Sequence, residues 1–141
     1  MNLQHALERM PQKGPMLLIE QVVSADASDI HCIACDHTSA DYPLRLDGRL
    51  MPVSLVELGA QAAAAHASII AIGDHHAGLL LALHRVEVTN PGALDSGERL
   101  HAHATQLHFD EGGARYSFTV TAGERAILTG QAMLKMEAVT P

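Results

Sequence analysis

One stretch, residues 50–72, dominates the hydrophobic pattern of the chain because it has almost no polar face. Its apolar residues recur at three- and four-residue spacing, and most of the other positions are alanine: Leu55, Leu58, Ala62, Ala65, Ile69 and Ile72. This period predicts an α-helix, and a helix that is apolar on every side is buried. Pro52 suits an early helical position, and Gly73 is a suitable stop. The alanines keep the helix thin, so strands can approach its axis closely.

Extended runs lie on both sides of this helix. The pattern predicts a short amphipathic helix over 2–9, strands over 16–24 and 30–37, and after the long helix four more strands over 79–89, 99–109, 114–121 and 126–136. The polar, glycine-containing segments 110–113 and 122–124 are typical of hairpin turns. This order predicts an α+β fold, a single domain over 1–141 in which an antiparallel sheet wraps around one long central helix.

Composition narrows the classes of function. The chain has 141 residues, a net charge of −7 and only 3% aromatic residues, so it lacks the basic footprint and the stacking surface of a nucleic-acid-binding protein. The N-terminal residues do not resemble a signal peptide. The long helix contains Glu57, Gln61 and His66, which argues against a membrane span. We therefore expect a soluble, cytoplasmic protein that binds neither nucleic acid nor membrane.

The two cysteines form a C-x-x-C sequence, Cys32 and Cys35, inside a predicted strand. Residues three apart on a strand point to opposite faces, whereas zinc or redox chemistry needs the two thiols together. The pattern therefore predicts reduced thiols with no metal or redox role.

Glu57 and Gln61 are the conspicuous polar residues of the apolar helix. They lie one turn apart on the same side, and a carboxylate is costly to bury without a partner. Two interpretations stay open from the residues alone. Glu57 is either a functional carboxylate or a structural one at a rim or paired with an arginine.

Several motifs resemble those of the hotdog-fold 3-hydroxyacyl-acyl-carrier-protein dehydratases of the FabA/FabZ type, over nearly the whole chain. They are Met51-Pro52 with Val56-Glu57 and Ala60-Gln61, Met10-Pro11 with Met16-Leu17-Leu18-Ile19, and Val86-Glu87-Val88, Pro91-Gly92 and Gly97-Glu98-Arg99-Leu100. The string Pro43-Leu44-Arg45-Leu46-Asp47-Gly48-Arg49-Leu50 is similar to the loop of a predicted dehydratase subgroup from aryl-polyene gene clusters. The resemblance implies a hotdog fold, a dimer, no cofactor, and an acyl carrier protein as partner.

The resemblance also implies roles for individual residues. Dehydration needs a base for the proton on C2, an acid for the hydroxyl on C3 and a group that polarises the thioester carbonyl. The family's His-Phe-Pro-Gly turn is absent here, where the chain reads Asp41-Tyr42-Pro43-Leu44, and the nearest upstream histidine is His37. By resemblance His37 is the base and Glu57 the acid, from opposite subunits.

The resemblance assigns supporting roles to Gln61 and Val53, and the residues themselves suggest roles for Asp41 and nearby arginines. Gln61 orients Glu57, and the backbone amide of Val53 holds the carbonyl. Asp41 is a replacement acid or base beside the substrate. Docking of an acidic carrier to a chain with net negative charge needs a local basic patch. The candidates are Arg45 and Arg49, on the loop before the helix, and Arg85 or Arg99.

The other histidines point to weaker hypotheses. His66 is expected to be a core or interface histidine with satisfied hydrogen bonds. His101 and His103 alternate on one strand face and His75 and His76 share a loop, but no carboxylate stands at ligand spacing, so no metal site is expected.

Three functions survive: a dehydratase of acyl thioesters in a fatty-acid- or polyene-type pathway, a non-catalytic hotdog partner in a heterodimer, and an acyl thioesterase in which Glu57 or Asp41 activates water.

Overall fold

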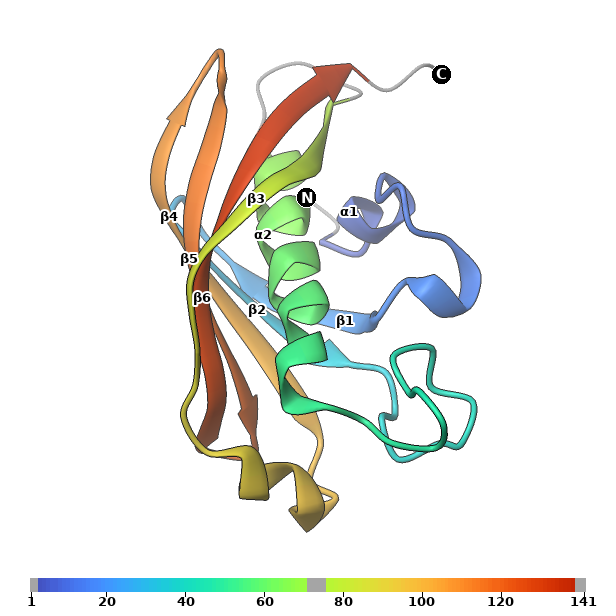
Figure 1. Ribbon diagram of the computed structural model, residues 1–141. Coiled ribbons are helices and arrows are strands. Elements are labelled where there is room, and N and C mark those ends of the chain that lie inside the picture. Colours follow the sequence, from blue (N-terminus) through green and yellow to red (C-terminus); the bar gives the residue numbers. More distant parts are fainter. Residues whose placement is uncertain (1–2, 71–75, 139–141) are drawn as a thin grey trace.

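The computed structural model describes residues 3–70 and 76–138 and contains one antiparallel sheet curved around one long helix (Figure 1). The helix α2 spans Val56–Ile70 and is preceded by a 3₁₀ turn, η2, at Pro52–Leu55. The strands are β1 Ile19–Ala25, β2 Asp29–Ala34, β3 His76–Val88, β4 Leu100–Asp110, β5 Gly113–Ala122 and β6 Arg125–Ala138. They lie in the order β1-β2-β4-β5-β6-β3. The predicted fold class is confirmed.

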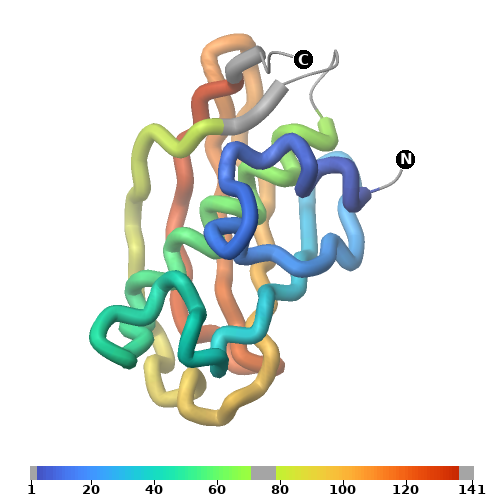
Figure 2. Tube along the Cα trace, turned by 90° about the vertical axis from the view of Figure 1, so that its right-hand side faces the viewer, coloured from blue at the N-terminus to red at the C-terminus, as the bar shows by residue number. Residues whose placement is uncertain are grey.

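Three short helical elements complete the chain. A single-turn helix, α1, spans His5–Glu8, and 3₁₀ turns occupy Gly14–Met16 (η1) and Pro91–Ser96 (η3). Seen from the open side of the sheet, the N-terminal segment and the loop before α2 lie in front of the helix (Figure 2). The helix is thus covered by sheet on one side and by these two segments on the other.

The sheet approaches α2 as closely as the alanine-rich sequence predicts. The ring of Phe118 on β5 is wedged between Gly59 of the helix and Gly130 of β6. A Cβ atom at Gly59 would lie 2.2 Å from Phe118 Cδ1, and one at Gly130 would lie 2.7 Å from Phe118 Cζ. Both positions therefore need glycine for the close approach.

One helix among the described residues, Pro52–Ile70, has the length and composition of a membrane span, but most of it is buried inside the protein. Leu55, Leu58 and the alanines Ala62 and Ala65 are fully buried. The apolar character of this helix is thus explained by its place in the core.

The boundaries of some helices and strands differ from the predicted ones where a tight turn lies next to them. The first strand begins at Ile19 rather than Met16, because Gly14, with φ of +58°, and Pro15 form a 3₁₀ turn that includes Met16. The first helix is a single turn. The proposed helix stop at Gly73 and the loop residue His75 lie outside the described residues.

Candidate functional site

Gln61 links Glu57 to the N-terminal segment. The buried Gln61 side chain accepts a hydrogen bond from the Leu18 N–H at 2.8 Å and donates one to the Met16 carbonyl at 2.9 Å. The same amide nitrogen donates to Glu57 Oε1 at 3.1 Å. The oxygen and the nitrogen of the Gln61 amide are therefore both engaged, and the nitrogen fixes one carboxylate oxygen of Glu57.

The half-buried Glu57 lines a small hollow between three parts of the fold. The hollow measures about 50 Å³, and its walls come from the N-terminal segment, α2 and the edge strand β3: Pro11, Gln12, Glu57, Ala60, Gln61, Ala64, Leu79 and Leu80. The side-chain oxygen of Gln12 is buried there without a hydrogen-bond partner. A buried acceptor without a donor is costly, so this hollow suits a further donor.

His37 follows β2 and begins the loop that leads to α2. Its side chain is 3% exposed, and neither ring nitrogen has a hydrogen-bond partner of good geometry. Burial is the largest cause of the lowered pKa of His37, and Arg45 and Arg99 also lower this pKa. Asp36 and the nearby Leu94 backbone oppose this shift in pKa. The ring is therefore held in its neutral form, the form in which an imidazole accepts a proton.

Arg45 shapes the loop around His37. Its guanidinium donates to the carbonyls of His37 at 2.9 Å, Ser39 at 3.0 Å and Gly48 at 3.1 Å. Three bonds from one rigid fork hold both ends of the loop together. The sequence did not predict this positioning role, and the string Pro43–Leu50 that contains Arg45 was its only signal. Arg49, the other predicted docking residue, is exposed.

The remaining predicted residues lie nearer the surface. Asp41 is exposed, and its backbone N–H donates to Ser39 Oγ at 3.2 Å. Val53 is 51% exposed in the turn that starts the helix. Beside them Tyr42 is buried with an unpartnered hydroxyl, and burial raises the pKa of Tyr42 to about 12. Sequence reasoning missed Tyr42.

Within the single chain, the candidate base and acid stay apart. No hydrogen bond joins His37 to Glu57 among the described residues, and His37 does not line the hollow that contains Glu57. The structure therefore brings together Glu57 with Gln61, and His37 with Arg45.

The surroundings of His66 and of the two cysteines indicate structural roles for these residues. The His66 ring bonds to the Tyr116 hydroxyl at 2.6 Å and to the Asp26 carbonyl at 2.8 Å, so its polar atoms are satisfied in the core. Cys32 and Cys35 are free thiols. Burial raises the pKa of Cys32 to about 12 and also raises the pKa of Cys35, so both stay protonated.

Solved structures share this fold. A chain of the dehydratase heterocomplex ApeI:P from Xenorhabdus doucetiae is 24% identical, with a TM-score of 0.73, over 93% of this chain and 90% of that one. A thioesterase family protein from Silicibacter pomeroyi is 18% identical, with a TM-score of 0.71 and 96% of both chains covered. The Haemophilus influenzae thioesterase HI1161 is 13% identical, with a TM-score of 0.65, over 86% and 80%.

The family itself is established by sequence. No curated protein sequence matches the chain significantly. A family model described as "ApeP-like: ApeP dehydratase" matches residues 4–137, which is nearly the whole chain. With the six-stranded sheet and its enclosed helix, this match shows that the chain belongs to the ApeP-like dehydratase family.

Proposed function

We propose that this protein is a subunit of a dehydratase that acts on 3-hydroxyacyl thioesters carried by an acyl carrier protein, in a fatty-acid- or polyene-type pathway. The observation that carries the proposal is the His37 imidazole, buried at 3% exposure with both nitrogens unpartnered. A buried ring of this kind lacks hydrogen bonds until a ligand or a partner chain supplies them.

The proposed reaction uses one proton acceptor and one proton donor. The neutral His37 ring takes the proton from C2, and the electron pair of that C–H bond forms the C2=C3 double bond. The C3–O bond breaks as Glu57 donates a proton, and the hydroxyl leaves as water. The amide of Val53, at the start of the helix, holds the thioester oxygen as negative charge develops on it.

The proposed site needs two chains, because His37 and Glu57 are separate in one. The edge strand β3 is hydrogen-bonded to β6 on one side, and no described strand pairs with its other side. It carries exposed apolar residues at Leu80, Leu81 and Val86, and natural proteins cover or pair such edges. Leu79 and Leu80 of this strand also line the Glu57 hollow, so a second hotdog chain paired along β3 would lie beside Glu57.

A non-catalytic role in a heterodimer is the second candidate. The ApeI:P structure is a complex of two different chains, and this chain lacks the usual His-Phe-Pro-Gly turn. In that case the catalytic groups come from the other subunit, and His37 supports the loop.

A thioesterase is the third candidate, because solved thioesterases share the fold. It would use Glu57 or the exposed Asp41 to activate water.

Carrier docking completes the proposal. Acyl carrier proteins are acidic, and Arg49 offers an exposed positive charge on the loop beside the proposed site. Arg45 is committed to three carbonyls of its own loop, so we assign it first to holding His37.

The decisive experiment measures hydration and dehydration of crotonyl and 3-hydroxyacyl thioesters, on carrier protein and on pantetheine. The chain is tested alone and with a hotdog partner. Loss of turnover in both His37→Ala and Glu57→Gln, with circular dichroism unchanged, supports the dehydratase. Activity that requires the partner and survives both substitutions identifies a helper subunit. Hydrolysis without hydration identifies a thioesterase.

A further inference from the structure

A small hollow on the sheet is lined by side chains that can donate hydrogen bonds. It measures about 190 Å³, and its described lining consists of His84, Arg85, Arg115 and Gln131, with no carboxylate among them. The chain has a net charge of −7 and only nine lysines and arginines, so two arginines at one hollow concentrate positive charge there. Sequence reasoning considered Arg85 for carrier docking and missed Arg115.

The alternation of the strands places this hollow on the face of the sheet that points away from α2. In β5, Ala114 and Tyr116 are buried on either side of Arg115, so Arg115 lies on the outer face. In β6, Ala132 is fully buried, which places the preceding Gln131 on the same outer face. The hollow is therefore separate from the proposed dehydratase site beside α2.

A β-bulge in β3 brings Arg85 to this hollow. His84 pairs with Gln131 and Glu87 with Thr129, so between these pairs two residues of β3 lie opposite one residue of β6. Arg85 has a φ of +52°, in the left-handed region that residues with a side chain rarely adopt. Neighbours in a regular strand point to opposite faces, but His84 and Arg85 line the same hollow. Bulges and strained residues of this kind are found where a side chain is aimed at a ligand.

The protein itself leaves most of these donors free. Among the described residues, no hydrogen bond or ion pair engages the side chains of Arg85, Arg115 or Gln131. His84 Nε2 lies 3.1 Å from Met133 Sδ, which is only a weak acceptor. Two free guanidinium groups on one hollow are the arrangement that recognises phosphate oxygens.

A larger and more apolar hollow adjoins this one at Arg115. It measures about 410 Å³, and its lining includes Leu81 and Met133. The carboxylate in this lining, Asp110, already accepts a hydrogen bond from His108 Nε2 at 2.7 Å. The adjoining hollow therefore offers apolar surface next to the arginines, in the size range of pockets for small organic molecules.

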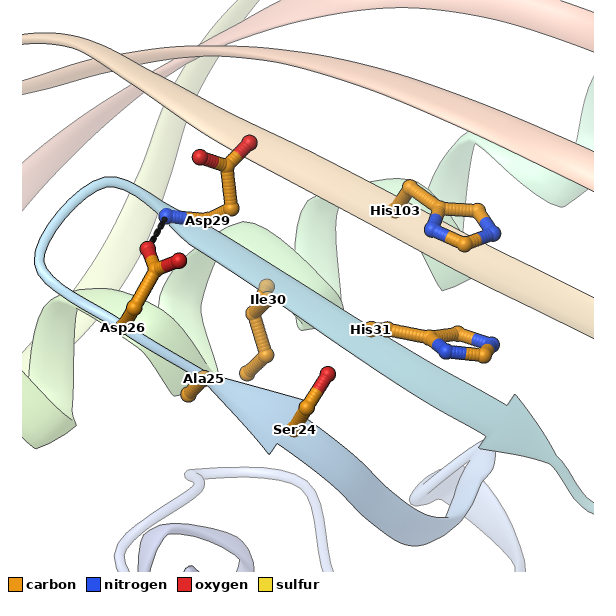
Figure 3. A pocket seen from close by; sticks show the side chains of 7 residues that line it. All are labelled: Ser24, Ala25, Asp26, Asp29, Ile30, His31 and His103. Atoms are coloured by element: carbon orange, nitrogen blue, oxygen red, sulfur yellow. Dashed lines mark hydrogen bonds between the residues drawn. The ribbon is translucent and has the colours of Figure 1, made fainter.

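The hollow beside the β1–β2 turn has the opposite charge (Figure 3). It measures about 370 Å³, and its described lining includes Asp26 and Asp29 but no lysine or arginine. Figure 3 shows the rings of His31 and His103 side by side at this hollow, and their centroids are 4.3 Å apart. Of these two polar hollows, the one lined by arginines is therefore suited to an anion.

We propose that Arg85, Arg115 and Gln131 bind the phosphate group of an organic phosphate monoester, whose apolar part lies over Leu81 and Met133. The guanidinium groups donate paired N–H bonds to the phosphate oxygens, and the Gln131 amide adds a neutral donor. The arginine-lined hollow is smaller than the roughly 300 Å³ of a usual ligand pocket, so it holds the phosphate alone. The adjoining hollow holds the rest of the molecule.

The test titrates the full chain with phenyl phosphate and with inorganic phosphate in a calorimeter at low ionic strength. We expect one equivalent of phenyl phosphate to bind, at least about fivefold more tightly than inorganic phosphate, because its ring buries apolar surface. Arg85→Gln and Arg115→Gln should each weaken binding at least about tenfold, since each removes hydrogen bonds between charged groups. Arg125→Gln, at an exposed arginine outside the hollow, is the matched control and should bind like the wild type.

Arg85→Gly separates a ligand-binding role from a structural one. Glycine adopts a positive φ without strain, which offsets the greater freedom of the unfolded chain. The variant should therefore melt within about 4 °C of the wild type while losing phosphate binding. Unchanged phosphate binding in Arg85→Gly would show that the bulge has only a structural role and would overturn the proposal.

Two further results would overturn the proposal. One is the absence of saturable binding of either probe to the wild type. The other is an equal loss of binding in Arg125→Gln and in the two glutamine variants of the hollow, which would indicate attraction to positive charge in general. Equal affinity for the two probes would overturn the placement of the apolar part. None of these measurements uses enzyme activity, so the outcome is independent of the proposed dehydratase function.

Discussion

Gln61 Nε2 donates to Glu57 Oε1 across one turn of α2, while the same side chain bonds to the backbone of Met16 and Leu18. One buried amide therefore positions the proposed acid and attaches the N-terminal segment to the core helix. A change at Gln61 should affect both stability and turnover.

Gln61→Leu tests the structural part of this double role. The substitution leaves the Leu18 N–H and the Met16 carbonyl without their partner, and an unsatisfied buried group costs about 1–3 kcal/mol. We expect the free energy of unfolding in urea to fall by that amount. Gln21→Leu, at an exposed position of β1, is the control and should change it by less than about 0.5 kcal/mol. Equal midpoints for Gln61→Leu and the wild type would contradict the prediction.

Gly59→Ala should destabilise the protein, although alanine normally favours a helix. Its Cβ would meet the Phe118 ring at 2.2 Å, and overpacking of this kind costs about 1–3 kcal/mol. Denaturant unfolding measures the loss. Phe118→Leu in the same chain should recover part of it, so the double-mutant cycle should show coupling between the two positions. Purely additive effects would mean that the ring does not limit the approach.

Stability should fall on mild acidification because of His37. Its pKa is lowered from 6.5 in the folded chain, so the unfolded chain binds the proton more tightly. The stability contribution is complete above the unfolded pKa of 6.5 and is lost as the pH falls below it toward the folded pKa. His31 and His103 act in the same direction.

His37→Gln removes one of these groups. We expect unfolding free energies measured between about pH 7.5 and 5 to decline less steeply than in the wild type. The relevant quantity is the slope of the unfolding free energy against pH, because the substitution also shifts the unfolding free energy by a constant amount at every pH. Identical slopes would show that His37 binds its proton equally in both states.

Substitutions of Arg45 and of Arg49 should reduce turnover on different sets of substrates. Arg45→Lys keeps the charge but loses the fork that holds the carbonyls of His37, Ser39 and Gly48, so turnover should fall on both carrier-bound and pantetheine substrates. Arg49→Glu should reduce turnover of the carrier-bound substrate but not of the pantetheine substrate, as expected of an exposed docking charge. The reverse pattern would exchange the two roles.

The β3 edge should determine assembly. Leu81 is 62% exposed on this strand, and Leu81→Lys should shift the protein from dimer toward monomer in light scattering. Leu46→Lys, at a 74% exposed loop position, is the matched control. A wild type that stays monomeric at micromolar concentration would exclude the proposed dimer.

The sequence predicts most of the fold because the fold depends on local patterns. The buried run of leucine and alanine defines α2, and alternation defines the strands. The turn at Met16 was missed, since a positive φ at Gly14 is not visible in a hydrophobic pattern. Of the site, only the contact of Gln61 with Glu57 follows from helical spacing. The Arg45 contacts and the pairing of His31 with His103 depend on loop shape and strand register, which local sequence does not specify.

The hydrogen bonds of His66 and Gln61 fix α2 within the fold. Because the His66 ring is attached to the β1–β2 turn through Asp26 and to β5 through Tyr116, and Gln61 attaches the middle of α2 to the N-terminal segment, the helix cannot slide along the sheet. The helix is therefore held in one position relative to the sheet and the N-terminal segment. The buried His37 ring lies under a loop that Arg45 fastens at the His37 carbonyl, so under the proposed function a substitution of Arg45 should change how accessible this ring is.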